Sequence, residues 1–379
     1  MLVVDPQTAS NLWIFFPSGP LLDAWSPADE VIALTNKCHD EDRRRKPRSM
    51  VSISLGRRLV ACLLNVSEAR RKDLVDMVAM AAVYNSEGCR REETTVLNIF
   101  NDHDYNRSVI TIVASIESIR EAVLSACEKA CQLFDMSIHS GVHPCLGAVD
   151  LIPIYPLGQD VGVQHCAKEA QAVAQGLTER VQGTSVFLFG WADSPLQRGL
   201  AQRRKEMGWF KKTPDLSSIR PDVGPLPQKA FGLTGVGASP YVMNCNVTID
   251  TQDVKIGQSI ASAIRESTAG GLPGVQVLAL PHEGAVEIAC NVESVQGSPP
   301  CQLTATTPWP SFSVGGQPYF HVPASLITAR VAELAGGHGV GTKGTALVGF
   351  TPQECRGLAE LALSQGIAEF WKEQRKTRM

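Results

Sequence analysis

The hydrophobic residues of this 379-residue chain follow two similar patterns, one after the other. In both, short uninterrupted apolar runs predict buried strands, and apolar residues recurring every three or four positions predict amphipathic helices. In the first pattern a helix is expected after the first strand, with Ser67 as its cap and Leu74, Met77, Val78 and Ala81 on its apolar face. The first pattern predicts strands near 59–66, 94–100, 108–114, 148–155 and 185–189, and further helices near 115–134 and 164–181.

The second pattern begins near residue 240 and repeats the alternation of strands and helices. Its last helix is expected to begin at Pro352, because proline is tolerated in the first turn of a helix. Both patterns mix hairpin and crossover connections, which indicates mixed β-sheets. The chain is therefore predicted to be an α/β (α+β) protein of two subdomains, 57–239 and 240–379, with a ligand cleft between them.

Residues 1–56 differ from the rest of the chain. They contain several prolines and the basic run 42–48, and they lack the uninterrupted apolar stretch of a signal peptide. We interpret them as a poorly ordered extension in preference to a cleaved targeting segment. The basic run is interpreted as a solvated charge cluster in preference to a nuclear signal.

Composition excludes several classes of protein. With 44% hydrophobic and 19% charged residues and a net charge of −3, the chain suits neither nucleic acid nor an anionic membrane as a main partner. No apolar run reaches the roughly 18 to 20 residues of a membrane span. The eleven cysteines show no paired CxxC spacing, which predicts reduced thiols in a cytoplasmic protein without a zinc site.

Two histidines, His139 and His143, lie in a loop between a predicted helix and a predicted strand. Their spacing suits metal ligands on a helix, but Gly141 and Pro144 oppose a helix and no further ligands complete a zinc set. A single histidine acting as general acid and base is the stronger functional interpretation, because its ordinary pKa is near 6.5. From the residues alone, the alternative that both rings only bind the loop backbone is equally open.

Three other stretches are ambiguous. A polar loop at a strand end contains Asp102, Asp104, Asn106 and Arg107. It either faces the same cleft or is a solvated hairpin turn, and the second interpretation is slightly favoured. The basic run 203–205 is expected to be the solvated face of a helix in preference to a site for an acidic ligand. The Gly- and Pro-rich stretch 221–238 is no packed element; its composition suits a linker, or a loop whose backbone approaches a ligand.

The histidine loop, residues 135–150, resembles the D-M-x-x-H-x-G-x-H-P-R-M-G-A-x-D loop of glutamate formimidoyltransferases, including the transferase half of formimidoyltransferase-cyclodeaminases. Further matches occur in the family's order, so that the resemblance covers residues 59–366. They lie at 65–68, 106–109, 221–225, 231–238, 271–275 and 347–352. The resemblance implies a two-subdomain transferase fold without a cyclodeaminase half and a tetrahydrofolate site in the cleft. The implied reaction moves a formimino group from N-formiminoglutamate to N5 of tetrahydrofolate.

Carried over by position, His143 matches the family's catalytic histidine. The family's folate-contacting segment falls on nine consecutive residues. They are Gly224, Pro225, Leu226, Pro227, Gln228, Lys229, Ala230, Phe231 and Gly232. The expected partners are therefore small molecules, with no metal, no nucleic acid and no membrane, and a homodimer stays open.

The chain departs from the family pattern at four positions. Val142 replaces the usual Glu before the catalytic histidine, Cys145 and Ser239 each replace an Arg, and Phe100 falls where the family has an Asp. Asp102 or Asp104 would substitute for that Asp only if the loop ran differently. The two lost arginines leave the folate pocket better supported than the donor pocket. Two alternatives stay open: a member that binds folate without this transfer, and an interaction protein on the inherited fold.

Overall fold

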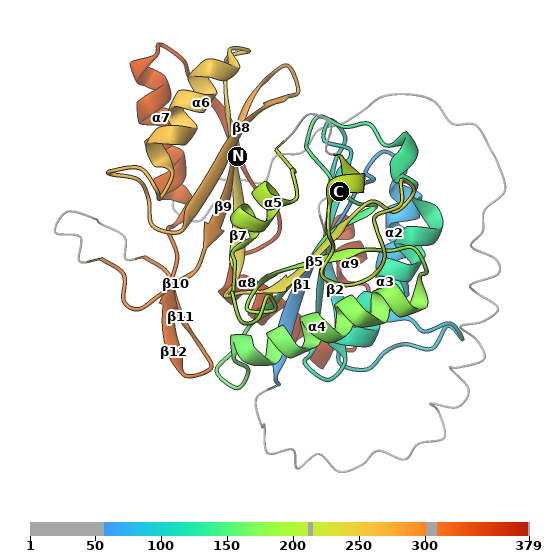
Figure 1. The fold of residues 1–379 in the computed structure, drawn as a ribbon. Helices are drawn as coiled ribbons and strands as arrows, with labels where there is room; N and C mark the ends of the chain where they lie inside the picture. Colours follow the sequence, from blue (N-terminus) through green and yellow to red (C-terminus); the bar gives the residue numbers. More distant parts are fainter. Residues whose placement is uncertain (1–56, 211–214, 301–308, 378–379) are drawn as a thin grey trace.

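The computed structural model describes residues 57–210, 215–300 and 309–377, and it confirms the α/β class (Figure 1). The extension predicted for residues 1–56 lies outside these ranges. Within them, no helix is both long enough and apolar enough to cross a membrane.

The first sheet has six strands in the order β2-β3-β1-β4-β6-β5. β1 pairs antiparallel with β3 and β4, whereas β6 pairs parallel with β4 and β5, so the predicted mixed sheet is confirmed. β3 and β4 are buried along their whole length, which explains why they read as continuous apolar runs. The strands are β1 Leu59–Val66, β2 Thr94–Asp102, β3 Arg107–Ser115, β4 Val149–Pro156, β5 Val186–Gly190 and β6 Thr234–Ala238.

The strand β6 corrects the prediction that stretch 221–238 holds no packed element. It is fully buried between β4 and β5, and two of its five residues are glycines. Gly235 lies opposite Phe187, whose ring would be 2.6 Å from a Cβ atom at that position. Gly237 lies opposite Phe189 in the same way. The glycines therefore make room for the aromatic rings of β5, a packing role that composition did not indicate.

Helices α2 (Lys72–Val83), α3 (Ile119–Leu133) and α4 (Val163–Arg180) cover one face of this sheet (Figure 1). The amphipathic helix predicted near 115–134 is confirmed as α3, which buries one apolar face. For α2 the prediction was partly wrong, since the helix starts five residues after Ser67 and Met77 is exposed. Val78 is buried as predicted, and Leu74 packs against the core. The Ser67 hydroxyl donates to the Gly147 carbonyl and thus fixes the histidine loop instead of capping a helix.

The second pattern forms a four-stranded sheet, β13-β7-β9-β8, and a small three-stranded sheet, β10-β12-β11. The strands are β7 Val242–Ile249, β8 Val275–His282, β9 Ala285–Glu293, β10 Val295–Gln296, β11 Ser311–Val314, β12 Gln317–Phe320 and β13 Thr342–Leu347. The helices are α6 Val254–Ile264, α7 Ala324–Gly337, α8 Pro352–Ser364 and α9 Phe370–Thr377. α8 begins at Pro352 as predicted, behind a capping box of Thr351 and Glu354, but α9 follows it.

An apolar core joins the two sheets. It contains Leu59, Ala61 and Leu63 of β1 together with Cys245 and Val247 of β7. After α8 the chain returns to the first sheet, where the Val96 amide donates to the Ala368 carbonyl. Trp371 belongs to the same buried core cluster as the apolar residues of α2 and α3. The division at 239/240 stays a prediction.

Polar groups collect where the strands of the first sheet end. The pairing directions place the carboxyl ends of β1 and β2 and the amino ends of β3, β4, β5 and β6 at one end of the sheet. The histidine loop enters β4 there, and the turn between β2 and β3 lies beside it.

Candidate functional site

The histidine loop is held between two other backbone segments. On one side the Val142 amide donates to the Asp104 carbonyl at 3.2 Å, and a Cβ atom on Gly141 would come within 2.1 Å of the Tyr105 carbonyl oxygen. On the other side the Ala148 amide donates to the Phe231 carbonyl at 2.9 Å. Only glycine permits the first approach. These contacts on both sides hold the loop backbone, and therefore His143, in one position.

His143 is half-buried between two aromatic rings. The centroid of its ring lies 5.2 Å from that of Tyr105 and 5.6 Å from that of Trp209, which it meets edge to face. Its Nδ1 atom lies 2.8 Å from the Pro144 carbonyl oxygen. A carbonyl only accepts hydrogen bonds, so Nδ1 carries the proton and the lone pair of the neutral ring is on Nε2. Nε2 takes part in none of the hydrogen bonds between described residues, which leaves a proton acceptor available.

His139 has a different role. Its Nδ1 lies 3.0 Å from the Ser67 carbonyl oxygen, and Asn106 donates to the neighbouring Ser140 carbonyl at 3.2 Å. Burial lowers the pKa of His139, although the Ser67 carbonyl opposes that shift. The alternative of backbone binding thus fits His139. Over the described ranges, no three His, Cys, Asp or Glu residues are grouped so that they could hold a metal ion.

A buried ion pair lies beneath the loop. The Arg107 guanidinium donates to Asp150 at 2.5 Å and to the Asn65 side-chain oxygen at 2.9 Å. It also lies 3.3 Å from the sulfur of Cys145. The second carboxylate oxygen of Asp150 accepts the Leu146 amide at 2.7 Å. Burial opposes ionisation of Asp150, but the guanidinium groups of Arg107 and Arg204 lower its pKa.

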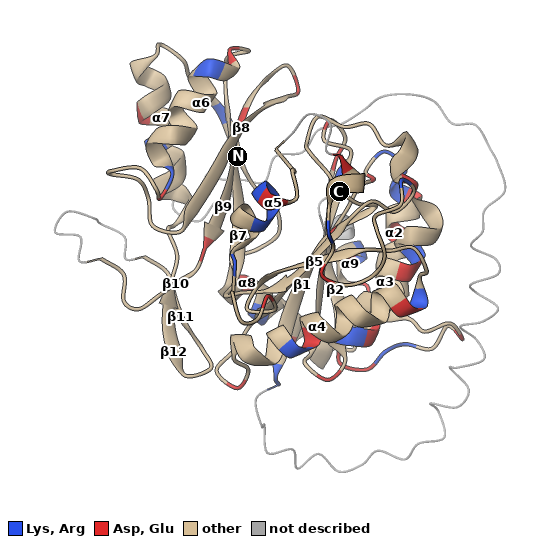
Figure 2. Ribbon diagram, in the orientation of Figure 1, with Lys and Arg blue, Asp and Glu red and all other residues tan. Residues whose placement is uncertain are grey.

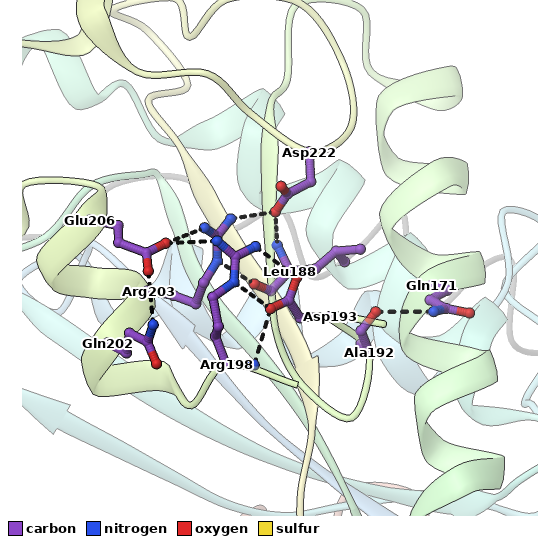
Figure 3. A network of polar contacts seen from close by, with 9 residues as sticks. All are labelled: Gln171, Leu188, Ala192, Asp193, Arg198, Gln202, Arg203, Glu206 and Asp222. Atoms are coloured by element: carbon purple, nitrogen blue, oxygen red, sulfur yellow. Dashed lines mark hydrogen bonds and ion pairs between the residues drawn. The ribbon is translucent and has the colours of Figure 1, made fainter. Parts of the chain in front are cut away.

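The basic stretch 203–205 lies in α5 (Leu200–Glu206), and the prediction that it is a solvated face was wrong for its first two residues. The Arg203 side chain is 3% exposed and the Arg204 side chain 11%. Figure 2 shows basic and acidic residues side by side on α5, and Figure 3 shows how one of them is satisfied. Arg203 donates to the Leu188 carbonyl at 2.8 Å and to Glu206 and Asp222 at 2.6 Å each.

We call the group in Figure 3 that contains Arg203 the closed network. Its charged members are Asp193, Arg198, Arg203, Glu206 and Asp222, and every one of them has a charged partner at hydrogen-bond distance. The network ties α5 to β5 through Leu188, whose amide donates to Asp222 and whose carbonyl accepts from Arg203.

Arg204 points to the other side of α5, toward His143. Its guanidinium carbon lies 4.5 Å from the centroid of the Trp209 ring, the ring that His143 also contacts. Its Nη2 atom is 3.8 Å from Asp150, too far for a hydrogen bond. We call His143, Arg204, Trp209, Asp150 and Arg107 the histidine site.

The turn between β2 and β3 is not the solvated hairpin turn that was slightly favoured. Asp102 lies 2.8 Å from Nε2 of His282 in β8, and the Tyr105 hydroxyl donates to Glu287 of β9 at 2.7 Å. Burial disfavours charge on His282, but the Asp102 hydrogen bond and the Glu287 charge together raise the pKa of His282 to about 9. These four residues, the junction cluster, join the two sheets next to His143.

The segment 224–232 is anchored at both ends. Gly232 has a φ of 69°, and a Cβ atom there would be 1.9 Å from the Leu146 carbonyl oxygen in the histidine loop. Gly224 has a φ of 88° and lies against the Thr184 carbonyl. Between them Leu226 is 51% exposed. The segment therefore borders the histidine loop and presents apolar surface to solvent, an arrangement that suits a ligand wall better than a linker.

One pocket of about 240 Å³ lies at the C-terminal end of α5. Neither His143 nor any residue of 224–232 lines it. Its walls are Glu206, Met207, Gly208, Asp215, Ser218, Ile219 and Arg220.

The positions that depart from the family pattern are now placed. Cys145 lies against Arg107, so a cation occupies the neighbourhood of the missing arginine. The Ser239 hydroxyl donates to the Pro240 carbonyl, Val142 is largely exposed, and Phe100 packs against the shared apolar core. Asp102 meets His282 and not His143.

Sequence reasoning missed Arg204, Tyr105, Trp209 and the residues from the second sheet. One available indication was Trp209 shortly after the basic run, because arginine stacks readily on tryptophan. The contacts of His282 and Glu287 with the turn join residues about 180 positions apart, and no local pattern indicates them.

Comparisons with known proteins show similarity to formimidoyltransferases. The N-terminal subdomain of the formiminotransferase domain matches residues 59–239. Glutamate formimidoyltransferase from Thermoplasma acidophilum is 31% identical over 249 residues, which are 64% of this chain and 78% of that protein. Glutamate formimidoyltransferase from Streptococcus pyogenes serotype M1 is 32% identical over 218 residues, 56% of this chain and 70% of that one. Formimidoyltransferase-cyclodeaminase from Sus scrofa is 32% identical over 194 residues, 50% of this chain and 34% of that protein.

Proposed function

Because this chain belongs to the glutamate formimidoyltransferase family, we propose that it is a folate-dependent one-carbon transferase. The proposed reaction moves a formimidoyl group from N-formiminoglutamate to N5 of tetrahydrofolate and releases glutamate. The observation that carries the proposal is the hydrogen-bonding of the His143 ring. One of its nitrogens is fixed by a carbonyl, and the other is left as a proton acceptor between Tyr105 and Trp209.

In the proposed mechanism His143 acts as general base and then as general acid. N5 of tetrahydrofolate attacks the formimino carbon, and Nε2 of His143 takes the proton that N5 loses. The bond from that carbon to the glutamate nitrogen then breaks, and His143 returns the proton to this nitrogen. The hydrogen bond from Nδ1 to the Pro144 carbonyl favours this mechanism, because it fixes the tautomer and leaves the lone pair on Nε2.

We propose residues 224–232 as the wall of the folate site. Their glycines let the backbone lie against the histidine loop, and the exposed Leu226 offers an apolar surface to a flat pterin ring. Eight of the described cysteines, among them Cys145 and Cys166, are free thiols, whereas Cys89 is disulfide-bonded, so the prediction of reduced thiols is wrong at Cys89. The cytoplasmic setting is a further proposal that rests on the eight free thiols.

Product formation from N-formiminoglutamate and tetrahydrofolate tests this proposal, together with calorimetric titration of tetrahydrofolate. We expect His143→Ala to lower kcat by about 10²- to 10⁴-fold and to leave tetrahydrofolate affinity unchanged, since only proton transfer is removed. Leu226→Ser should weaken tetrahydrofolate binding and leave kcat unchanged. Unchanged turnover in His143→Ala would remove the mechanism. Tight folate binding without turnover by the unaltered protein would select a folate-binding member that does not catalyse the transfer.

A further inference from the structure

We propose that Arg204 is the carboxylate-binding residue of the histidine site, holding an anionic group of the substrate beside His143. The inference rests on the proposed function for the identity of the substrates. It deepens that function by assigning a binding role to a residue outside the matched motifs. The carboxylate is expected to come from the donor or from the glutamate tail of the folate, and the two sources are separable by experiment.

The first reason is that the protein leaves the donors of Arg204 unused. In the parts of the chain that the structure describes, its guanidinium makes no hydrogen bond, although its side chain is only 11% exposed. Buried guanidinium groups ordinarily have their N–H groups paired, as Arg203 has one position earlier. The 3.8 Å ion pair with Asp150 is too long to use these N–H groups, and burying a charge without hydrogen bonds is costly, so a carboxylate of a ligand is the simplest partner.

The second reason is a count of charges. Arg107 and Arg204 both face Asp150, whose two oxygens already accept from Arg107 and from the Leu146 amide. Two cations thus share one carboxylate, and the surplus positive charge lies on the Arg204 side. Burial lowers the pKa of Arg204 to about 10, consistent with incomplete compensation. Cys145 also raises the pKa of Arg204, but its sulfur lies at hydrogen-bond distance from Arg107 and makes no hydrogen bond with Arg204.

The third reason is position. Arg204 stacks on the Trp209 ring, and His143 meets the same ring edge to face. A carboxylate bound by Arg204 would therefore lie near the proton-transfer nitrogen. The closed network on the opposite side of α5 fixes the helix, so Arg204 is held in place before substrate arrives (Figure 3). Arg204 would also supply a cation that the motif lacks at Cys145 and Ser239.

The test compares Arg204→Gln with Lys205→Gln, an exposed neighbour on α5 that loses the same charge. Calorimetry measures binding of glutamate, N-formiminoglutamate and tetrahydrofolate. Two ligands without the carboxylates, formamidine and tetrahydropteroate, serve as controls. We expect Arg204→Gln to weaken one carboxylate ligand by about ten- to a hundred-fold, the range of a charge-assisted hydrogen bond. Weaker binding of glutamate and N-formiminoglutamate would identify the donor as the source of the carboxylate. Weaker binding of tetrahydrofolate would identify the folate tail as the source.

The inference is overturned if Arg204→Gln binds every ligand with the affinity of the unaltered protein. It is also overturned if the variant loses as much affinity for formamidine and tetrahydropteroate as for the carboxylate ligands, or if the unaltered protein binds no carboxylate ligand. Should Arg204→Gln fail to fold by circular dichroism, Arg204→Lys decides. It keeps the charge but loses the planar fork, so we expect at least a three-fold loss, and full affinity would reject the role. Carboxylate binding that depends on Arg204 in a protein without turnover would reject the transfer reaction and keep this site.

Discussion

Arg203 and Arg204 are consecutive residues of one short helix, and their side chains are 3% and 11% exposed, yet their electrostatic surroundings differ. Arg203 is surrounded by Glu206, Asp222 and a carbonyl of β5, so its charge is balanced and its donors are used. Arg204 shares Asp150 with Arg107 and stacks on Trp209 without a hydrogen bond. The difference teaches that burial of a charge does not by itself reveal its role. A satisfied charge holds the fold, and an unsatisfied one beside a proton acceptor indicates a binding site.

The strongest way to break this comparison is to remove the carboxylate on each side. Asp150→Asn leaves Arg107 and Arg204 buried without a counter-charge, and we expect a loss of about 3 to 5 kcal/mol in the free energy of unfolding. Asp222→Asn is the matched control. Its carboxylate is 29% exposed, so water replaces part of the interaction and a loss of about 1 to 2 kcal/mol is expected. Urea denaturation measures both, and equal losses would contradict the proposed charge surplus.

The contrast between the two arginines also shows how far sequence reasoning reaches. Strands such as β1 and β4 and the buried face of α3 were predictable, because continuous apolar runs and a period of 3.6 residues record burial directly. β6 was missed because its glycines are chosen for the rings of Phe187 and Phe189, partners about 48 residues away. Local composition carries no trace of such a fit.

The site was partly predictable for the same reason. His143 and the segment 224–232 were named from their motifs, but which buried charge is satisfied depends on partners brought together by folding. A basic run indicates a solvated face unless the neighbouring strand and turn are known, as Arg203 with Leu188 and Asp222 shows. Likewise, Asp102 becomes informative only once β8 places His282 beside it.

A second, somewhat smaller effect is a pH dependence of stability that is expected for the junction cluster and not for the closed network. The charged groups of the closed network are guanidinium and carboxylate groups only, whereas the junction cluster beside His143 contains His282, whose pKa is raised to about 9. Because this value lies above the ordinary one near 6.5, the native state holds the proton more tightly. The stabilisation is complete below pH 6.5 and is lost as the pH rises through 9. It amounts to about 3 kcal/mol.

His282→Gln isolates this contribution, since the amide retains a donor for Asp102 but carries no charge. The difference in unfolding free energy between the unaltered protein and the variant should be largest at pH 6 and shrink by about 3 kcal/mol by pH 10. Denaturation curves at several pH values measure it. A difference that stays constant with pH would show that His282 is not charged in the native state. The junction cluster would then make no pH-dependent contribution to stability.

The smallest effect, and the most direct test of the comparison, comes from replacing each arginine by an apolar residue of similar length. Arg203→Met removes bonds to two carboxylates and a carbonyl, so we expect a loss of about 2 to 3 kcal/mol in unfolding free energy. Arg204→Met removes an uncompensated buried cation and keeps apolar contact with Trp209. Its stability should therefore stay within about 1 kcal/mol of the unaltered protein, or rise. If Arg204→Met proves as destabilising as Arg203→Met, the Arg204 charge is already satisfied in the free protein, and the two arginines serve the same structural purpose.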